Sequence, residues 1–328
     1  MHGFLVEQFG GTEVMQWREL DPLEPGPRQV LVEVKASGVN FAETRMRAGT
    51  YSGQELPFVM GMECAGVVAE CGDEVGEFKP GDRVFGRARG SHAEAVVFDA
   101  DHLMPLPDAV SFIEGAAIPV SWLTAWHALD AVAGFRQGQR ILIEAIASGV
   151  GSAALQIAKW RDCWVAGTAS RDPKLEIARE WGCDAVYNYK RDDVPALVQR
   201  DTDRQGIDIG LMTIGEETAE SLIACMGMDG KIVMYGSTGG RQVCFNLNIG
   251  VRNLSLMSMS ISTSERFMTY TMHRFREVAL PLFADGAFKA PVGTVLPLSE
   301  VVRAHQLVDE RNHFGKIILT AGSMPTVS

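Results

Sequence analysis

The order of apolar and polar positions changes twice along the chain, and each change predicts a different kind of structure. Residues 1–117 contain short β-like runs separated by turn residues. In the run Val30–Lys35 apolar and polar side chains alternate, as they do in a half-buried strand, and Lys79–Asp82 predicts a turn. Strands at this spacing predict an antiparallel, barrel-like module.

Between residues 118 and 261 strands and helices alternate. Arg140–Ala145 is short and mostly apolar, which predicts a strand, and Gly149–Arg161 has the apolar spacing of a helix. Further strand candidates follow at Trp164–Gly167, Ala185–Tyr187, Ile207–Leu211, Lys231–Tyr235 and Leu254–Met259. This alternation predicts βαβ units, and hence a parallel sheet with helices on both faces. The pattern changes again after residue 262, where Glu265–Phe283 predicts a helix and Lys316–Thr320 a final strand.

Composition narrows the class of protein. The 328 residues are 46% apolar and 22% charged, which is typical of a globular chain with two domains. With 30 basic against 41 acidic side chains the formal charge is -11, and no basic run exceeds two residues, so nucleic acid is not the expected partner. No apolar stretch is long enough to span a membrane, and we see no signal peptide. The six cysteines form no CxxC pair, so we expect reduced thiols and a cytoplasmic protein.

The strongest local signal is the segment Ile141–Ala154, in which a strand runs into a glycine-rich turn and then a helix. Gly149, Val150, Gly151 and Ala154 match the pattern G-x-G-x-x-A of dinucleotide-binding folds. We expect Gly149 to permit the tight turn and Gly151 to let the backbone approach a pyrophosphate at the helix N-terminus. The alternative is a tight turn that binds no ligand.

The end of the next strand indicates which dinucleotide is bound. NAD sites place an acidic residue there, whereas this chain has Ser170 and Arg171, followed by Lys174 one helical turn later. One hydroxyl and two cations suit a 2′-phosphate, so we expect NADPH. Asp172 argues the other way, unless it merely begins the helix that contains Pro173.

These features occur in the order of a known family. The chain resembles the quinone oxidoreductase branch, which includes ζ-crystallin-like proteins, of the medium-chain dehydrogenase/reductase superfamily. The matching segments are Ala36–Phe41, Gly61–Gly66, Lys79–Val84, Ser148–Ser152, Asn188–Tyr189 and Phe314–Lys316.

The resemblance implies an α/β protein with two domains. A GroES-like, β-rich catalytic domain comprises residues 1–117 and 262–328, and a doubly wound Rossmann domain comprises residues 118–261. It also implies a homodimer joined through the edges of the Rossmann sheets, with Leu254–Met259 as the candidate edge strand.

The resemblance also bears on metals. Zinc-using relatives have Cys and His where this chain has Asn40 and Met62, and an amide with a thioether does not make a zinc site. None of the seven histidines is placed for a metal site or a catalytic triad, and we expect His92 and His127 to be polar core residues. Without a metal Lewis acid, the substrate is expected to be electrophilic already, such as a quinone or an α,β-unsaturated carbonyl.

Two residues are predicted to be catalytic by resemblance. Asn40 follows a strand at the turn that faces the predicted cleft, where it would bond to the nicotinamide ribose or the substrate carbonyl. The alternative is a turn Asn with a local Asx-type bond. Tyr51 lies in a loop that the resemblance places over the active site, where its phenol would donate a hydrogen bond or a proton; alternatively it only packs the loop. Arg45 replaces a tyrosine of some relatives, and it either attracts an anionic substrate or faces solvent.

The remaining cofactor contacts are also implied by resemblance. Thr124 matches a helix-start position on the nicotinamide side, or it is an interior helix residue. Lys316 would reach the cofactor from the C-terminal segment, or it faces solvent. The other predicted contacts, each at the end of a strand, are Tyr189, Tyr235, Gly236 and Ser237.

The resulting hypothesis is a zinc-independent oxidoreductase that transfers hydride from NADPH to a quinone or enone. Two alternatives stay open. One is an enoyl reductase of a polyketide-type biosynthetic pathway. The other is an NADPH-binding protein with little turnover.

Overall fold

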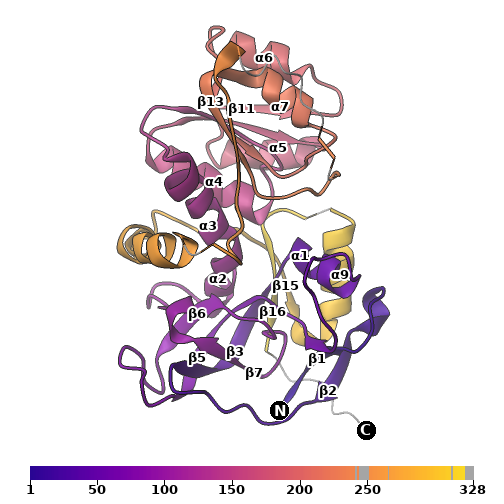
Figure 1. Cartoon of the computed structure of the whole chain (residues 1–328), viewed down its shortest axis with the longest axis vertical. Helices are drawn as coiled ribbons and strands as arrows, with labels where there is room; N and C mark the ends of the chain where they lie inside the picture. Colours follow the sequence, from indigo (N-terminus) through magenta and orange to yellow (C-terminus); the bar gives the residue numbers. More distant parts are fainter. Residues whose placement is uncertain (241, 244–250, 265, 312, 322–328) are drawn as a thin grey trace. The chain divides into compact units, whose positions relative to one another are not determined.

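The computed structural model describes residues 1–240, 242–243, 251–264, 266–311 and 313–321, and the chain forms two compact units (Figure 1). One unit contains Met1–Val120 and Arg276–Ser328, and the other contains Ser121–Phe275. The second boundary lies downstream of the predicted one at residue 262. The reason is packing, because the fully buried Phe267 and Phe275 contact His127 and Trp126 edge to face.

The first unit, here called the catalytic unit, is built on a seven-stranded sheet. Its strands are β3 (Gln29–Val39), β5 (Glu63–Cys71), β6 (Arg83–Arg87), β7 (Ala95–Asp99), β8 (Leu103–Pro105), β15 (Val292–Pro297) and β16 (Lys316–Thr320). The order is β15-β16-β3-β5-β6-β8, and β7 also pairs with β3. All pairs are antiparallel except β15 with β16. The long strand β3 contains the predicted strand Val30–Lys35. It pairs with β5 and β7 of the N-terminal segment and with β16 of the C-terminal segment.

A smaller sheet and several helices cover this core. The sheet has the order β2-β1-β4, with β1 (His2–Val6), β2 (Gln16–Glu19) and β4 (Phe58–Val59). The helices are α1 (Phe41–Arg47), α2 (Phe112–Ala116), α8 (Leu280–Ala284) and α9 (Val301–Asp309). Val301 and Ala304 of α9 pack with Val6, Val39 and Ile317 in one buried cluster. The C-terminal segment therefore completes a core that the N-terminal segment begins.

The second unit, here called the nucleotide unit, contains a six-stranded sheet in which every neighbouring pair is parallel. Its strands are β9 (Arg140–Ile143), β10 (Trp164–Ala169), β11 (Ala185–Asn188), β12 (Ile207–Met212), β13 (Met226–Met234) and β14 (Ser255–Ser258). The order β11-β10-β9-β12-β13-β14 is that of the doubly wound dinucleotide fold. The predicted edge strand Leu254–Met259 corresponds to β14, which is the last strand of this order.

Helices connect these strands. They are α3 (Pro119–Trp126), which contains the unit boundary, α4 (Gly149–Trp160), α5 (Asp172–Glu180), α6 (Val194–Asp201) and α7 (Ala219–Cys225). Three π-helical segments, His127–Ala133, Phe267–Met272 and Phe275–Ala279, and three 3-10 turns, Thr12–Val14, Ala100–His102 and Leu298–Glu300, complete the described elements. The predicted helix Glu265–Phe283 is thus a series of shorter elements, and Glu265 itself lies outside the described residues. No helix in the described ranges is long and apolar enough to cross a membrane.

Candidate functional site

The nucleotide unit has a topological switch point between β9 and β12. The chain runs from β9 toward β10 on one side, whereas β12 lies on the other side of β9 and leads to β13. Ligands of such sheets bind at the carboxyl ends of the strands around this point. The predicted cofactor residues of the nucleotide unit, apart from Thr124, follow the carboxyl ends of β9, β10, β11 and β13, and parallel strands bring these ends to one edge of the sheet.

The helix α4 begins directly after the turn that follows β9. The Ser148 hydroxyl accepts a hydrogen bond from the Gly151 N–H at 3.0 Å, which caps the helix. The N–H groups of Gly149 and Val150 belong to the first turn and have no partner within the helix, so they can bind an anion. A Cβ on Gly151 would lie 2.5 Å from the Ala145 carbonyl oxygen, and only glycine fits there.

The structure corrects the role predicted for Gly149. Gly149 is the first residue of α4 and does not have a positive φ. The left-handed residue of the turn is Ala145, with a φ of 49°. The glycine fingerprint therefore located the turn correctly, but the tight backbone conformation belongs to an alanine four residues earlier.

The residues predicted to bind a 2′-phosphate lie together after β10. Ser170 is exposed and follows the last residue of the strand, Arg171 is the exposed N-cap of α5, and the half-buried Lys174 is in the first turn. The carboxylate of Asp172 accepts hydrogen bonds from Asn188 Nδ2 at 3.0 Å and Arg191 Nη1 at 2.5 Å.

These two bonds lower the pKa of Asp172, the bond from Asn188 being the larger cause. Asp172 is the first residue of α5 and its carboxylate oxygens are occupied.

The other predicted cofactor residues divide into two groups. Tyr189 directly follows β11, and Tyr235, Gly236 and Ser237 directly follow β13. Thr124, by contrast, is the sixth residue of α3 and is buried, so the prediction that it starts a helix was wrong. The Tyr235 hydroxyl is buried beside the Thr213 side chain, and a Cβ on Gly236 would lie 2.4 Å from Thr213 Oγ1. The end of β13 therefore combines a tyrosine hydroxyl with a backbone that packs closely at Gly236.

Glu144 is a site residue that the sequence analysis missed. It follows β9, is buried, and its carboxylate accepts bonds from the backbone N–H groups of Thr213 (2.8 Å) and Ile214 (2.7 Å) and from the Thr218 hydroxyl (2.5 Å). Burial raises the pKa of Glu144, and these three bonds oppose the rise. Glu144 thus joins the ends of β9 and β12 at the switch point. The available signal was an acidic residue inside the apolar run of residues 140–145.

In the catalytic unit, Asn40 is the N-cap residue of α1, but its side chain does not cap the helix. Its amide nitrogen donates to Glu63 Oε1 at 2.8 Å and to Glu43 Oε1 at 3.1 Å. Its amide oxygen accepts a bond from Lys316 Nζ at 2.6 Å. The side chain is buried within this polar cluster, and it also makes one local bond, from its amide nitrogen to the Gly38 carbonyl at 3.5 Å.

Lys316 lies at the centre of that cluster and is only 4% exposed. Its ammonium donates to the Val39 carbonyl (3.0 Å), to Asn40 Oδ1 (2.6 Å) and to Glu63 Oε1 (2.5 Å). The other oxygen of Glu63 accepts from the Val120 N–H at 2.6 Å. The alternative that Lys316 faces solvent is therefore wrong, and its contact with a cofactor remains a prediction.

A second buried group adjoins Asn40. Glu43, His92 and His305 come from α1, from the loop between β6 and β7, and from α9, and all three side chains are fully buried. His92 Nε2 lies 3.0 Å from Glu43 Oε2, and His305 Nε2 lies 3.9 Å from the same oxygen. Burial raises the pKa of Glu43, but His92 and the other polar neighbours outweigh it, so the net direction is downward. Burial lowers the pKa of His305 to about 4.

His92 and His127 are buried polar residues, as predicted. The sequence analysis expected no histidine to be placed for a metal, whereas here two histidines meet one carboxylate. No sequence spacing indicated this group, since its members are 49 and 213 positions apart in the chain.

Tyr51 follows α1 in an irregular segment and is half-buried. Its N–H donates to the Arg45 carbonyl at 3.1 Å. Arg45 is also half-buried, with its guanidinium 5.2 Å from the centre of the Phe41 ring. Burial lowers the pKa of Arg87, while Glu63 and then Tyr51 oppose that shift, so Tyr51 lies near this guanidinium. The catalytic role of Tyr51 stays a prediction.

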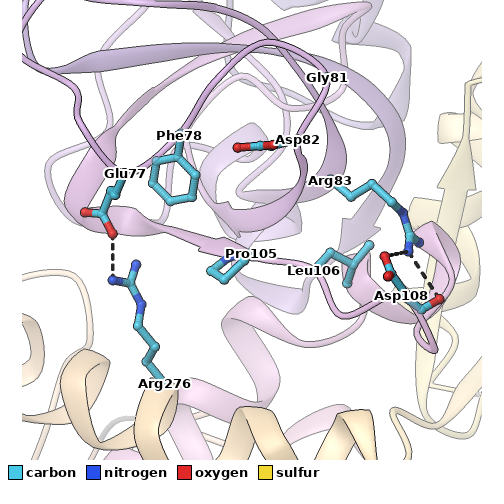
Figure 2. A pocket seen from close by; sticks show the side chains of 9 residues that line it. All are labelled: Glu77, Phe78, Gly81, Asp82, Arg83, Pro105, Leu106, Asp108 and Arg276. Carbon is cyan, nitrogen blue, oxygen red and sulfur yellow. Dashed lines mark hydrogen bonds and ion pairs between the residues drawn. The ribbon is translucent and has the colours of Figure 1, made fainter.

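The catalytic unit also has a surface depression of about 500 Å³ away from these residues (Figure 2). Each arginine that lines it already contacts a carboxylate: Arg276 lies 2.8 Å from Glu77 and Arg83 lies 3.6 Å from Asp108. Both lining cations are therefore engaged, and we assign no ligand to it.

Comparisons with known proteins agree with this arrangement. The family model of the alcohol dehydrogenase GroES-like domain matches residues 26–108, and that of the zinc-binding dehydrogenase matches residues 149–284. A quinone oxidoreductase of Pseudomonas aeruginosa is 32% identical over 95% of this chain and 97% of its own. The crystal structure of Escherichia coli quinone oxidoreductase complexed with NADPH is 29% identical, with a TM-score of 0.89 over 98% of this chain and 100% of that chain.

A mycocerosic acid synthase-like polyketide synthase of Mycobacterium tuberculosis is 29% identical over 94% of this chain. The match covers only 15% of that much longer protein.

The name of the second family model raises the question of a catalytic zinc. At the positions where zinc-using relatives have Cys and His, the residues here are Asn40 and Met62. The Asn40 amide is engaged by Lys316, Glu43 and Glu63, and a thioether is not a zinc ligand. The residues at this position do not fit a zinc ion.

Proposed function

Since the chain belongs to the quinone oxidoreductase family of the medium-chain dehydrogenase/reductase superfamily, we propose that it reduces quinones or other α,β-unsaturated carbonyl compounds with NADPH. The observation that carries this proposal is the set of binding groups at one edge of the parallel sheet. The N-terminus of α4 offers N–H groups for a pyrophosphate, and Ser170, Arg171 and Lys174 offer a hydroxyl and two cations for a 2′-phosphate.

When bound, NADPH supplies the hydride, so the protein contributes binding, orientation and electrostatics. The α4 N-terminus and the residues after β10 hold the dinucleotide at one end. Tyr235 directly follows β13, and its hydroxyl can donate to a polar group that binds there. Glu144 keeps the ends of β9 and β12 together while the ligand enters and leaves.

In the catalytic unit, Asn40 is held at three points by Lys316, Glu63 and Glu43. Because its amide hydrogens already face two carboxylates, a bond from Asn40 to substrate requires one of these bonds to be released or shared. This geometry gives Asn40 a fixed position, which favours orientation of a reactant over proton transfer. Tyr51 is the candidate donor for the oxyanion that forms on an enone or enoyl substrate, whose neighbouring carbon must also be protonated.

A second candidate function is reduction of a 2-enoyl thioester. The match to a polyketide synthase supports it. An enoyl reductase must protonate the carbon next to the one that accepts hydride, and a quinone reductase has no such requirement. Enoyl reduction therefore requires a proton donor such as Tyr51, whereas quinone reduction does not.

The test is the loss of reduced-nicotinamide absorbance, with NADPH and NADH in parallel, against quinones, enones and 2-enoyl thioesters. Faster oxidation of NADPH with a quinone or enone supports the proposal. Turnover with enoyl thioesters alone supports the second candidate. Tight NADPH binding without oxidation by any acceptor favours a binding protein, and absence of nucleotide binding contradicts the argument from the α4 N-terminus.

We also propose a homodimer in which β14 pairs with its counterpart in a second copy. β14 is the last strand of the described sheet, so one of its edges is open for such pairing. Sedimentation at several concentrations tests this proposal, and a monomer throughout would contradict it.

A further inference from the structure

The buried group of Glu43, His92 and His305 enters the proposed function only through the hydrogen bond from Asn40 to Glu43. Its members lie on three separate elements of the catalytic unit, and one ligand atom from each lies within 4.8 Å of the other two. Two imidazoles and one carboxylate form a donor set that zinc and other divalent transition metals prefer. All three side chains are fully buried.

His305 is the member whose bonding is incomplete. Neither of its ring nitrogens has a hydrogen-bond partner in the ranges that the structure describes. Leaving a buried polar group without a partner is costly, and such groups are rare in folded proteins. The 3.9 Å between His305 Nε2 and Glu43 Oε2 is too long for a hydrogen bond. It is compatible with two atoms that bind one ion, each at about 2.0–2.2 Å.

The other two members are already oriented by neighbours. His92 Nδ1 lies 2.8 Å from the Ser37 hydroxyl, and Glu43 Oε1 accepts a bond from Asn40 Nδ2 at 3.1 Å. These contacts engage the far atoms of both side chains and leave His92 Nε2 and Glu43 Oε2 facing each other and His305. Outer contacts of this kind, with a hydroxyl or an amide, are typical of side chains that bind metals.

The buried charges point in the same direction. Lys316 balances Glu63, and Arg47 pairs with Asp309 at 2.9 Å. The groups that face Glu43 Oε2 among the described residues are the two imidazoles. A cation at the centre of the group would therefore balance the Glu43 carboxylate and would also give His305 a partner.

We propose that Glu43, His92 and His305 bind one divalent transition-metal ion, with zinc as the first candidate. This site is separate from the Asn40 and Met62 positions, which do not fit zinc. The ion would join α1, the β6–β7 loop and α9, and so fasten the C-terminal segment to the N-terminal one. Because Glu43 also holds Asn40, occupancy of the site would help to position the predicted catalytic amide.

The experiment uses the full chain without a histidine tag, first stripped with a chelator and dialysed. Zn²⁺ or Co²⁺ is then titrated in, and bound metal is measured by mass spectrometry after gel filtration. For Co²⁺, visible absorption reports the coordination of the ion. We expect one equivalent per chain, tight enough to survive gel filtration, and a rise in Tm of several degrees.

The variants H305Q and E43Q should each lose the bound equivalent and the rise in Tm. The matched control is H2A, since His2 lies 3.6 Å from Glu94 in an exposed histidine–carboxylate pair without a second imidazole. H2A should bind the metal as the wild type does. A wild-type chain that retains no metal and shows no change in Tm would overturn the proposal, as would full binding by both H305Q and E43Q.

The wild-type titration decides the question even where a variant does not fold. It reads metal content and stability rather than turnover, so its outcome is independent of whether NADPH or quinone is used.

Discussion

Lys316 Nζ lies 2.6 Å from Asn40 Oδ1, although the two residues are 276 positions apart in the chain. Both were predicted to contact ligand, and the structure shows that they contact each other. The same ammonium bonds to Glu63, so an ion pair buried in the catalytic unit fixes the amide of Asn40.

Replacing Lys316 should show how much the buried ion pair contributes to stability. In K316M, Glu63 and Asn40 lose their cationic partner, and an uncompensated buried charge costs about 3–5 kcal/mol. We expect the free energy of unfolding, measured in denaturant, to fall by that amount. The control is K35M, since Lys35 pairs with Glu33 at the surface and should change stability by no more than about 0.5 kcal/mol. Equal effects of the two variants would contradict the role of the buried pair.

The close approach at Gly151 predicts a second effect. In G151A the added Cβ would lie 2.5 Å from the Ala145 carbonyl oxygen, so the turn must shift and the N–H groups of α4 move with it. We expect a loss of about 1–3 kcal/mol in stability and at least about tenfold weaker NADPH binding, measured by calorimetry. G76A is the control, because a Cβ on Gly76 meets no atom within 4 Å. Unchanged NADPH affinity in G151A would contradict the assignment.

The preference for NADPH should depend on Arg171 and Lys174. A charged hydrogen bond contributes about 1.5–3 kcal/mol, so R171A or K174A should each raise the KM for NADPH about 10- to 100-fold. The KM for NADH should hardly change in either variant. R179A removes an exposed cation near the other end of α5 and serves as the control. If the KM values for NADPH and NADH rise equally, these residues do not recognise the 2′-phosphate.

Tyr51 separates the two candidate reactions. General acid catalysis contributes about 100-fold or more, so Y51F should slow enoyl reduction by that factor if the phenol protonates carbon. Reduction of a quinone should change by less than about twofold, because no protein acid is needed there. Y270F, which alters a tyrosine that is 40% exposed, is the control. A large loss with quinones would show that Tyr51 acts in hydride transfer as well.

His127 predicts a dependence of stability on pH. Burial, and secondarily Arg266, lowers the pKa of His127 in the folded protein to about 4, from 6.5 in an unfolded chain. Between these two values the unfolded state binds more protons, so stability is full above pH 6.5 and declines as the pH falls toward 4.

The variant H127Q, which can keep a bond to the Thr271 hydroxyl, should lose stability less steeply in this window than the wild type does. Urea unfolding at half-unit steps of pH measures the difference, and H273Q, at an exposed histidine, is the control. Identical slopes in H127Q and the wild type would contradict the prediction.

Local patterns predicted the parts of the fold that depend on neighbouring residues. The strand, turn and helix at residues 140–160 follow from apolar spacing and glycines, and the structure has β9 and α4 there. The error at Thr124 has a different origin, because that assignment came from the resemblance, whereas the helical spacing itself begins at Pro119, where α3 begins.

The buried polar clusters could not be predicted in this way. Lys316 reaches Asn40 because β16 pairs antiparallel with β3 and Ile317 lies opposite Val39. That register depends on tertiary packing and leaves no trace in the spacing of either segment. His92 and His305 meet Glu43 for the same kind of reason, and each residue alone looked like an ordinary core position.

The position of β16 between β15 and β3 affects the order in which the two units can fold during translation. The nucleotide unit is one uninterrupted stretch of chain, so it can fold while translation continues. The catalytic unit must wait, because the strand that covers one edge of β3, and the lysine that neutralises Glu63, are translated only after the whole nucleotide unit. Until then the first 120 residues have an open strand edge and a buried acid without its cation, which is a state that chaperones would recognise.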